Sequence, residues 1–208
     1  QGATYEQRLR SRDKESGDKI VWNAVSTVIG KGTFKGRSAV LINTEATVTE
    51  GGFTSVSQVD NYIQLQRSKS RIRNFGSVAN TFIDGVDQGT VEVILDPPRL
   101  TRFDLRPGQR YTQKLVVEIT SSAPQGRLTD RISERITRIY VGRQTIKVPV
   151  GRRQACKFRT ITRSTRFGVT SKEVTTEWQD LNSGLLLKAV SGSEVTVLLR
   201  GKIDGRNI

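Results

Sequence analysis

The chain of 208 residues contains no histidine, no methionine and only one cysteine. The absence of histidine removes the usual general base and the commonest metal ligand. A single cysteine cannot form a disulfide within the chain. We therefore expect no catalytic residue, no metal site and no cofactor, and the composition does not predict an enzyme.

Long apolar runs and aromatic residues are also scarce. No stretch approaches the ~18 apolar residues that a membrane-spanning helix requires, so we predict no transmembrane segment. Aromatic residues make up 6% of the chain and do not interleave with the basic ones. A nucleic-acid surface normally combines both, so we do not expect nucleic acid as a partner.

The chain begins at Gln1 instead of a methionine. This start is what we expect once a signal peptide has been removed. We therefore predict a periplasmic or extracellular protein.

What the chain has in excess is positive charge. Lysine and arginine number 34 against 20 acidic residues, which gives a net charge of +14. Residues 97–166 hold 17 basic and four acidic residues, so this segment carries almost the whole imbalance. Such a charge attracts polyanions but says nothing about the fold.

Short runs rich in valine, isoleucine and threonine alternate with glycine, proline and aspartate turns, which is typical of β-strands. We predict a mainly β, antiparallel protein with at most one short helix and a single domain over residues 19–208. Residues 131–139 fit either a helical stripe or a strand, and the Tyr-Val after them favours a strand. Residues 1–18 form a polar N-terminal arm with only Tyr5 and Leu9 as large apolar side chains. The arm either folds onto the edge of its own sheet or joins a neighbouring copy into a homo-oligomer.

The segment 139–200 predicts consecutive antiparallel strands. Two-residue alternation within each strand places Cys156 and Phe158, and separately Val174 and Trp178, on the core side. The same pattern leaves Glu173 and Glu177 pointing outward. There they could pair with the outward basic residues of the preceding strand, which are Lys157, Arg159 and Arg163.

Three stretches resemble a family of exported β-proteins of unknown function from Gram-negative bacteria. They are VGRQTIKVPVGRRQACKF (141–158), TTEWQDLNSGLLLKA (175–189) and, more weakly, LDPPRLTRFDLRPGQRYTQ (95–113), in which Tyr111 stands where an indole is usual. The resemblance covers about residues 90–200. It implies a strongly curved sheet or half-barrel, similar to the periplasmic lipoprotein carriers, and it transfers no site residue.

Several patterns that suggest chemistry have a simpler explanation. The glycine-rich segment 30–36 is predicted to be a hairpin turn and no phosphate loop, because no helix follows it. Cys156 is in line with Phe158, as a small core residue would be. Asp84, Asp87 and Glu92 supply too few acids at alternating positions for a calcium loop.

The basic residues Arg67, Lys69, Arg71 and Arg73 are the strongest site candidate. If residues 62–73 form one strand, alternation puts all four on one face, where like charges repel unless an anion lies opposite. The face is either a solvated edge strand that resists edge pairing or an anion-binding ladder. The leading hypothesis is a non-catalytic envelope or surface protein that binds anionic or amphipathic material, such as an anionic envelope component or polysaccharide. The alternative is a structural subunit of an extracellular assembly or filament, joined through residues 1–18.

Overall fold

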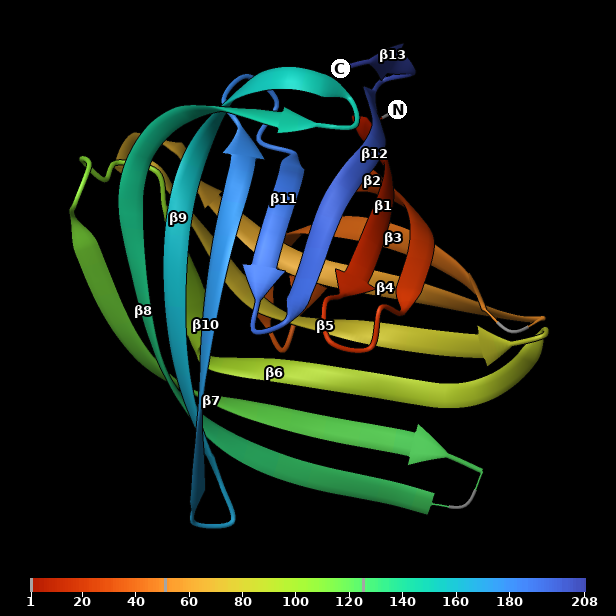
Figure 1. Ribbon diagram of the computed structural model, residues 1–208. Coiled ribbons are helices and arrows are strands. Elements are labelled where there is room, and N and C mark those ends of the chain that lie inside the picture. The colour runs from red at the N-terminus through yellow and green to blue at the C-terminus, as the bar shows by residue number, and fades with distance from the viewer. Residues whose placement is uncertain (1, 51, 125) are drawn as a thin grey trace.

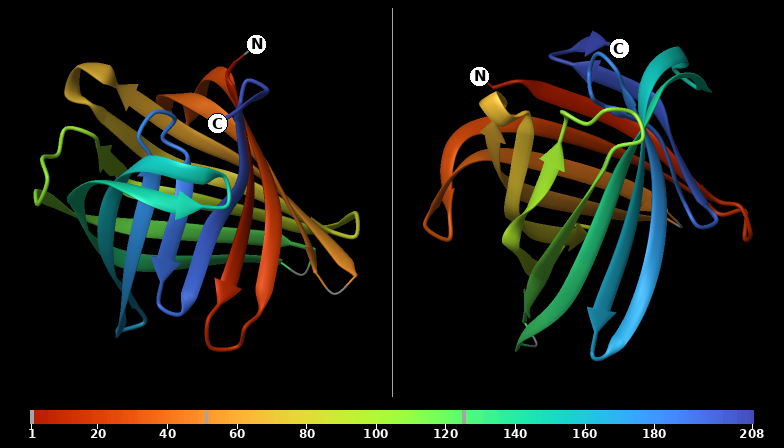
Figure 2. Two further views of the ribbon diagram at one scale, coloured as in Figure 1. Left: turned by 45° about the horizontal axis from the view of Figure 1, so that its top comes forward. Right: turned by 90° about the vertical axis from the view of Figure 1, so that its left-hand side faces the viewer.

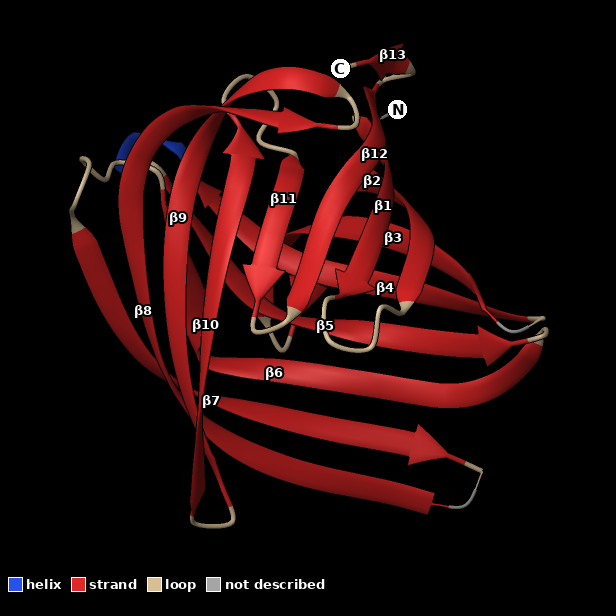
Figure 3. Ribbon diagram, viewed as in Figure 1, coloured by secondary structure: helices blue, strands red, loops and turns tan. Residues whose placement is uncertain are grey.

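The computed structural model describes residues 2–50, 52–124 and 126–208. Almost all of them lie in strands, and the one helical turn in these ranges is the 3₁₀ turn η1 (Arg67–Lys69) (Figure 3). The strands are β1 (Thr4–Asp13), β2 (Lys19–Phe34), β3 (Arg37–Glu50), β4 (Phe53–Gln66), β5 (Arg71–Ile83), β6 (Val86–Arg102), β7 (Arg110–Ala123), β8 (Gly126–Val148), β9 (Gly151–Arg166), β10 (Val169–Asp180), β11 (Leu186–Ser191), β12 (Glu194–Ile203) and β13 (Arg206–Asn207).

The sheet closes on itself (Figure 1). Each strand from β1 to β12 pairs with the next one in sequence, and β1 also pairs with β12. The result is a closed barrel of twelve antiparallel strands, with the short β13 paired to β12 alone. The open half-barrel expected from the sequence is therefore wrong, because the first strand joins the two edges that a half-barrel would leave free.

That closing strand comes from the segment expected to be a polar arm. Thr4–Asp13 pairs along its length with β2 on one side and β12 on the other. Backbone hydrogen bonds order this segment although it has few apolar side chains, as the fold-back alternative requires. The arm is thus a strand of the domain's own sheet, and residues 19–208 alone do not complete the barrel.

The antiparallel neighbours are joined by tight hairpins. At Asp84–Gly85 both residues have positive φ, 48° and 81°, as a type I′ turn requires. The Asp84 side chain also accepts a hydrogen bond from the backbone N–H of Thr54 at 2.8 Å. Aspartate-glycine is the strongest hairpin dipeptide, which is why this turn could be predicted from sequence. Residues 131–139, for which the sequence favoured a strand over a helix, lie within β8 and form a strand.

Register assigns each residue to the inside or the outside of the barrel. On β1, Leu9 and Ser11 are buried while Arg8, Arg10 and Arg12 are exposed. Directly opposed residues of antiparallel strands share a face, so the inner and outer faces can be followed from strand to strand around the ring. The two views of Figure 2 show the strands enclosing a single interior, with the β8–β9 hairpin curling outward at one end.

The pairing of β9 with β10 corrects one expectation. Cys156 and Phe158 share the inner face with Tyr140, but Phe158 is opposite Glu177, and Trp178 is opposite Lys157 on the outer face. Val174 lies on the outer face with Trp178. Alternation within each strand was right, but the offset between the strands is set by the hairpin, and one residue of offset exchanges the two faces.

The largest fully buried side chains are Leu187 and Leu198, which pack with Leu9 in a cluster beside the closing strand. We predict that Leu198→Ala lowers the free energy of unfolding by about 2–5 kcal/mol, because it leaves a cavity in this cluster. Urea denaturation measures the change. Leu65→Ala is the control: its side chain is 46% exposed, and the substitution should change stability by less than about 0.5 kcal/mol. Equal losses in both variants would contradict the assignment of the core.

Candidate functional site

The ladder between β6 and β7 is interrupted part of the way along. The two strands pair from Thr90–Asp96 to Val116–Ser122, and the chain then continues through Pro97 and Pro98, which have no N–H to donate. Beyond them, β6 pairs only with β5 and β7 only with β8. The barrel wall therefore has a gap in its backbone ladder here.

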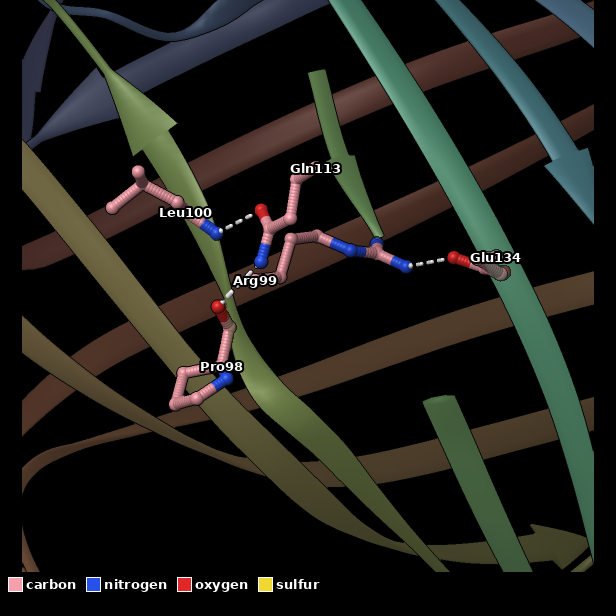
Figure 4. A network of polar contacts seen from close by, with 5 residues as sticks. All are labelled: Pro98, Arg99, Leu100, Gln113 and Glu134. Atoms are coloured by element: carbon pink, nitrogen blue, oxygen red, sulfur yellow. Dashed lines mark hydrogen bonds and ion pairs between the residues drawn. The ribbon is translucent and has the colours of Figure 1, made fainter. Parts of the chain in front are cut away.

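Two side chains of β7 bridge this gap. The Gln113 side-chain oxygen accepts a hydrogen bond from the Leu100 backbone N–H at 2.8 Å, and its amide donates to the Pro98 carbonyl at 2.7 Å (Figure 4). The Tyr111 hydroxyl donates to the Leu100 carbonyl at 2.7 Å. These three bonds replace backbone bonds, and we call Tyr111 and Gln113 the side-chain bridge.

The inner side of the gap is held by an ion pair. Arg99 on β6 reaches Glu134 on β8 with an Nη2–Oε2 distance of 2.9 Å (Figure 4). The Glu134 side chain is 15% exposed. Next to it, Arg138 and Glu177 form a second inward pair at 3.3 Å, so acids and bases inside this part of the barrel neutralise one another.

We predict that Gln113→Leu destabilises the protein by about 1–3 kcal/mol, because it leaves two half-buried backbone groups without protein partners. Tyr111→Phe should cost about 1 kcal/mol, since it removes one hydrogen bond and keeps the ring. Urea denaturation measures both, and the Leu100 amide should exchange its hydrogen faster in Gln113→Leu. The control Ser122→Ala changes an exposed side chain of the same strand and should be nearly neutral. A Gln113→Leu protein as stable as the wild type would show that the bridge contributes nothing.

Burial raises the pKa of Tyr111 above its ordinary value of 10.0, so the bridging hydroxyl stays protonated as a donor. A raised pKa means that this contribution to stability is complete below the unfolded tyrosine's pKa and is lost as pH rises through the folded value. We predict that unfolding free energy falls above pH 10 and falls less steeply in Tyr111→Phe. Alkaline urea titrations of the two proteins should differ in slope; identical slopes would refute this role of the hydroxyl.

On the outer side of the gap lies a cavity of about 800 Å³. Four arginines line it, from three strands: Arg37 on β3, Arg71 and Arg73 on β5, and Arg102 on β6. Its apolar part comes from Phe75, the two prolines and Leu100. We call this cavity the arginine groove.

The four arginines are not equally free to bind an anion. Arg102 makes two hydrogen bonds to Asp104, at 2.9 and 2.7 Å, which hold the pKa of that carboxyl below its usual range. Arg37 lies 3.9 Å from Asp96. Arg71 and Arg73 have no ion pair within the described residues. The buried Arg71 Nε has no hydrogen-bond partner there, although the charge of Arg71 also helps to lower the pKa of Asp104. Arg71 and Arg73 are therefore the groove's available cations.

The structure does not place the four basic residues Arg67, Lys69, Arg71 and Arg73 on one strand face, where the sequence predicted them. Arg71 and Arg73 lie together on the outer face of β5 and line the groove, whereas Arg67 and Lys69 lie in η1 and are exposed. The strand stops at Gln66 and turns through Ser70, which has a φ of 45°. No glycine or proline marks this turn, so alternation was carried through it in error. Binding of an anion by the four residues stays a prediction.

Sequence reasoning missed Arg37 and Arg102 as partners of Arg71 and Arg73. Arg102 is opposite Arg71 in the β5–β6 ladder, and Arg37 follows the β2–β3 turn. That hairpin tip is held over β6 by an ion pair between Lys35 and Glu92 at 2.8 Å. The adjacent residues Pro97 and Pro98, which indicate an interrupted strand, were the sequence feature that could have pointed to this site.

The remaining sequence candidates have structural roles. Segment 30–36 was expected to be a turn throughout, but residues 30–34 are the end of β2 and only Lys35 and Gly36 form the turn into β3. Asp87 accepts a hydrogen bond from the Gly89 backbone at 2.7 Å. Among the described residues no group of three His, Cys, Asp or Glu is placed to hold a metal ion. Cys156 packs against the cluster of Leu105, Tyr140 and Phe158, and the Tyr140 hydroxyl lies 3.8 Å from its sulfur.

No helix in the described part of the chain has both the length and the apolar character needed to cross a membrane.

Comparison with known proteins identifies the fold. No family model and no curated protein matches the chain. A Bacteroides fragilis protein thought to be exported, with a YmcC-like fold, superposes with a TM-score of 0.53 over 97% of this chain and 96% of its own, at 12% identity. The chain is thus similar in fold to this protein along almost its whole length.

Two further solved structures superpose with lower scores. A Parabacteroides distasonis protein thought to be a lipoprotein has a TM-score of 0.49 at 13% identity, over 97% of this chain and 95% of that one. The hypothetical lipoprotein YmcC from Escherichia coli K12 has a TM-score of 0.35 at 13% identity, over 95% and 83% of the two chains.

Proposed function

We propose that this protein is a non-catalytic, exported envelope protein that binds an anionic ligand in the arginine groove. The observation that carries the proposal is that Arg71 and Arg73 line a cavity of about 800 Å³ and have no ion pair within the described residues. A guanidinium presents a fork of donors that matches the oxygens of a carboxylate or phosphate. The apolar part of the groove suits the non-ionic portion of an amphipathic ligand.

The envelope location is supported by the likeness in fold. The similar Bacteroides fragilis protein is thought to be exported. A periplasmic or extracellular address belongs to the proposal together with the ligand.

A non-catalytic role is supported by the surroundings of the one nucleophile. Cys156 has a tyrosine hydroxyl at 3.8 Å as its hydrogen-bond partner. With no histidine in the chain, the usual base that activates a thiol is missing.

The alternative of a filament subunit joined through residues 1–18 has less support. Both backbone edges of β1 are already paired within one chain, by β2 and β12. Donating this strand to a neighbour would open the donor's own barrel.

We predict that Arg71→Gln combined with Arg73→Gln lowers retention on a phosphocellulose column and weakens binding of short anionic ligands about tenfold or more, since a hydrogen bond to a charged group contributes about 1.5–3 kcal/mol. The matched control is Arg127→Gln with Arg152→Gln, two exposed arginines on β8 and β9. The difference should shrink as salt shortens the Debye length below about 8 Å. If both double variants lost the same amount of retention and affinity, the groove would bind anions no better than other positively charged surface.

A further inference from the structure

Four basic residues lie directly opposite one another across four neighbouring strands. Lys114 on β7 is opposite Arg135 on β8, Arg135 is opposite Arg163 on β9, and Arg163 is opposite Lys172 on β10. All four side chains are exposed on the outer face. We call these residues the basic row.

This arrangement opposes like charges at every step. Directly opposed side chains have Cβ atoms about 4.5–5.5 Å apart, and like charges at that distance destabilise the pairing. Across residues 2–50, 52–124 and 126–208 no ion pair involves any of the four. The row therefore opposes like charges without an ion pair in the described part of the chain, although Asp96 and Glu134 line the same hollow.

The acids expected to neutralise this region are on the other side of the wall. Glu173 and Glu177 point into the barrel, where Glu173 accepts a hydrogen bond from Ser191 at 2.6 Å and Glu177 pairs with Arg138. Glu134 is likewise occupied inside by Arg99. Glu173, Glu177 and Glu134 therefore do not pair with the basic row, which stays without an ion pair on the outer face of the described chain.

Three of the four residues of the row line a shallow hollow next to the arginine groove. Lys114, Arg135 and Arg163 line this cavity of about 470 Å³, whose walls also include Asp96, Pro97 and Glu134. Asp96 and Pro97 also line the arginine groove. The two cavities thus meet at the Asp96–Pro97 segment of β6.

Hydroxyl groups flank the row on both sides. Ser133, Thr165 and Thr170 occupy the next cross-strand positions on one side, with Thr165 and Thr170 2.9 Å apart through their hydroxyls. On the other side Thr112 and Thr137 are opposed, with hydroxyls 2.9 Å apart. None of the described residues lining this cavity is aromatic.

We propose that the basic row and the arginine groove form one track for a single chain of an acidic polysaccharide. At a strand spacing of about 4.8 Å the row alone spans about 14 Å, so it offers a line of charges to an extended polymer. The flanking hydroxyls would bind sugar hydroxyls. A nucleic acid would call for aromatic side chains on which bases stack, and a line of charges one residue wide in a hollow suits a single polymer better than a membrane surface.

This inference rests on the proposed function and adds the expectation that affinity increases with the length of the bound chain. The probes are digalacturonate, which can occupy only part of the track, and decagalacturonate, which can span the row and the groove together. Isothermal titration calorimetry at low salt should show that the wild-type protein binds the longer chain at least about tenfold more tightly.

The test variant is Arg135→Thr with Arg163→Thr, which removes the two central charges and introduces a residue that favours strands. It should bind decagalacturonate about tenfold more weakly, while its affinity for digalacturonate stays unchanged. Its melting temperature at low salt should rise by about 1–3 °C because opposed charges have been removed.

The matched control is Arg8→Thr with Arg200→Thr. These exposed arginines are also directly opposed, on β1 and β12, but lie outside the track. The control should gain similar thermal stability and lose no affinity for either probe. A rise in melting temperature in both variants shows that they are folded, so a loss of affinity in the row variant alone supports the track.

Each other outcome has a defined meaning. If Arg71→Gln with Arg73→Gln abolishes binding of digalacturonate but the row variant binds decagalacturonate normally, the track is refuted and the proposed function stands. If neither probe binds the wild-type protein, both are refuted. If a single-stranded oligonucleotide or phosphatidylglycerol vesicles bind more tightly than decagalacturonate and depend on the row, the polysaccharide assignment is overturned in favour of that ligand.

Discussion

The pairing of β1 with both β2 and β12 is the constraint on which the rest of the structure depends. An open sheet of this length would present two strand edges, each a row of unpaired N–H and C=O groups ready to pair with another chain. One polar strand satisfies both edges at once, and closure gives every strand from β1 to β12 two neighbours. Closure also gives the sheet an inner and an outer face, and the charged side chains are distributed between these two faces.

The charged side chains on the two faces of the barrel wall differ in how they are paired. Inside, Arg99 and Arg138 are neutralised by Glu134 and Glu177. Outside, the strands β7 to β10 present the basic row without an ion pair in the described chain. Taking a charge away from water is costly unless it is paired, which is a physical reason for the pairing of the largely buried Arg138 with Glu177.

The interruption between β6 and β7 links this surface to a cavity. Pro97 and Pro98 end the backbone ladder, and Gln113 and Tyr111 hold the strands together with side-chain hydrogen bonds instead. A continuous ladder would bring the two strands to within about 4.8 Å and would leave no room between them. The break thus opens the arginine groove, while the bridge keeps the barrel wall intact behind it.

The sequence by itself determined the class of fold and most strand positions. Local signals suffice for these, because β-branched runs predict strands and Asp84–Gly85 predicts a hairpin. Alternation also paired Cys156 with Phe158 correctly, because that relation lies within one strand. It failed at Gln66–Ser70, where a turn without glycine or proline divides Arg67 and Lys69 from Arg71 and Arg73.

Only the tertiary structure decided closure, register and the composition of the site. Whether β1 meets β12 depends on nearly two hundred intervening residues, and no local pattern encodes it. Register between neighbouring strands decides which residues share a face, and one residue of offset exchanges inside and outside. That is why Glu173 and Glu177, expected to neutralise the outer basic residues, lie inside. It is also why Lys114, Arg135, Arg163 and Lys172 form a row although the first and the last lie 58 positions apart in the sequence.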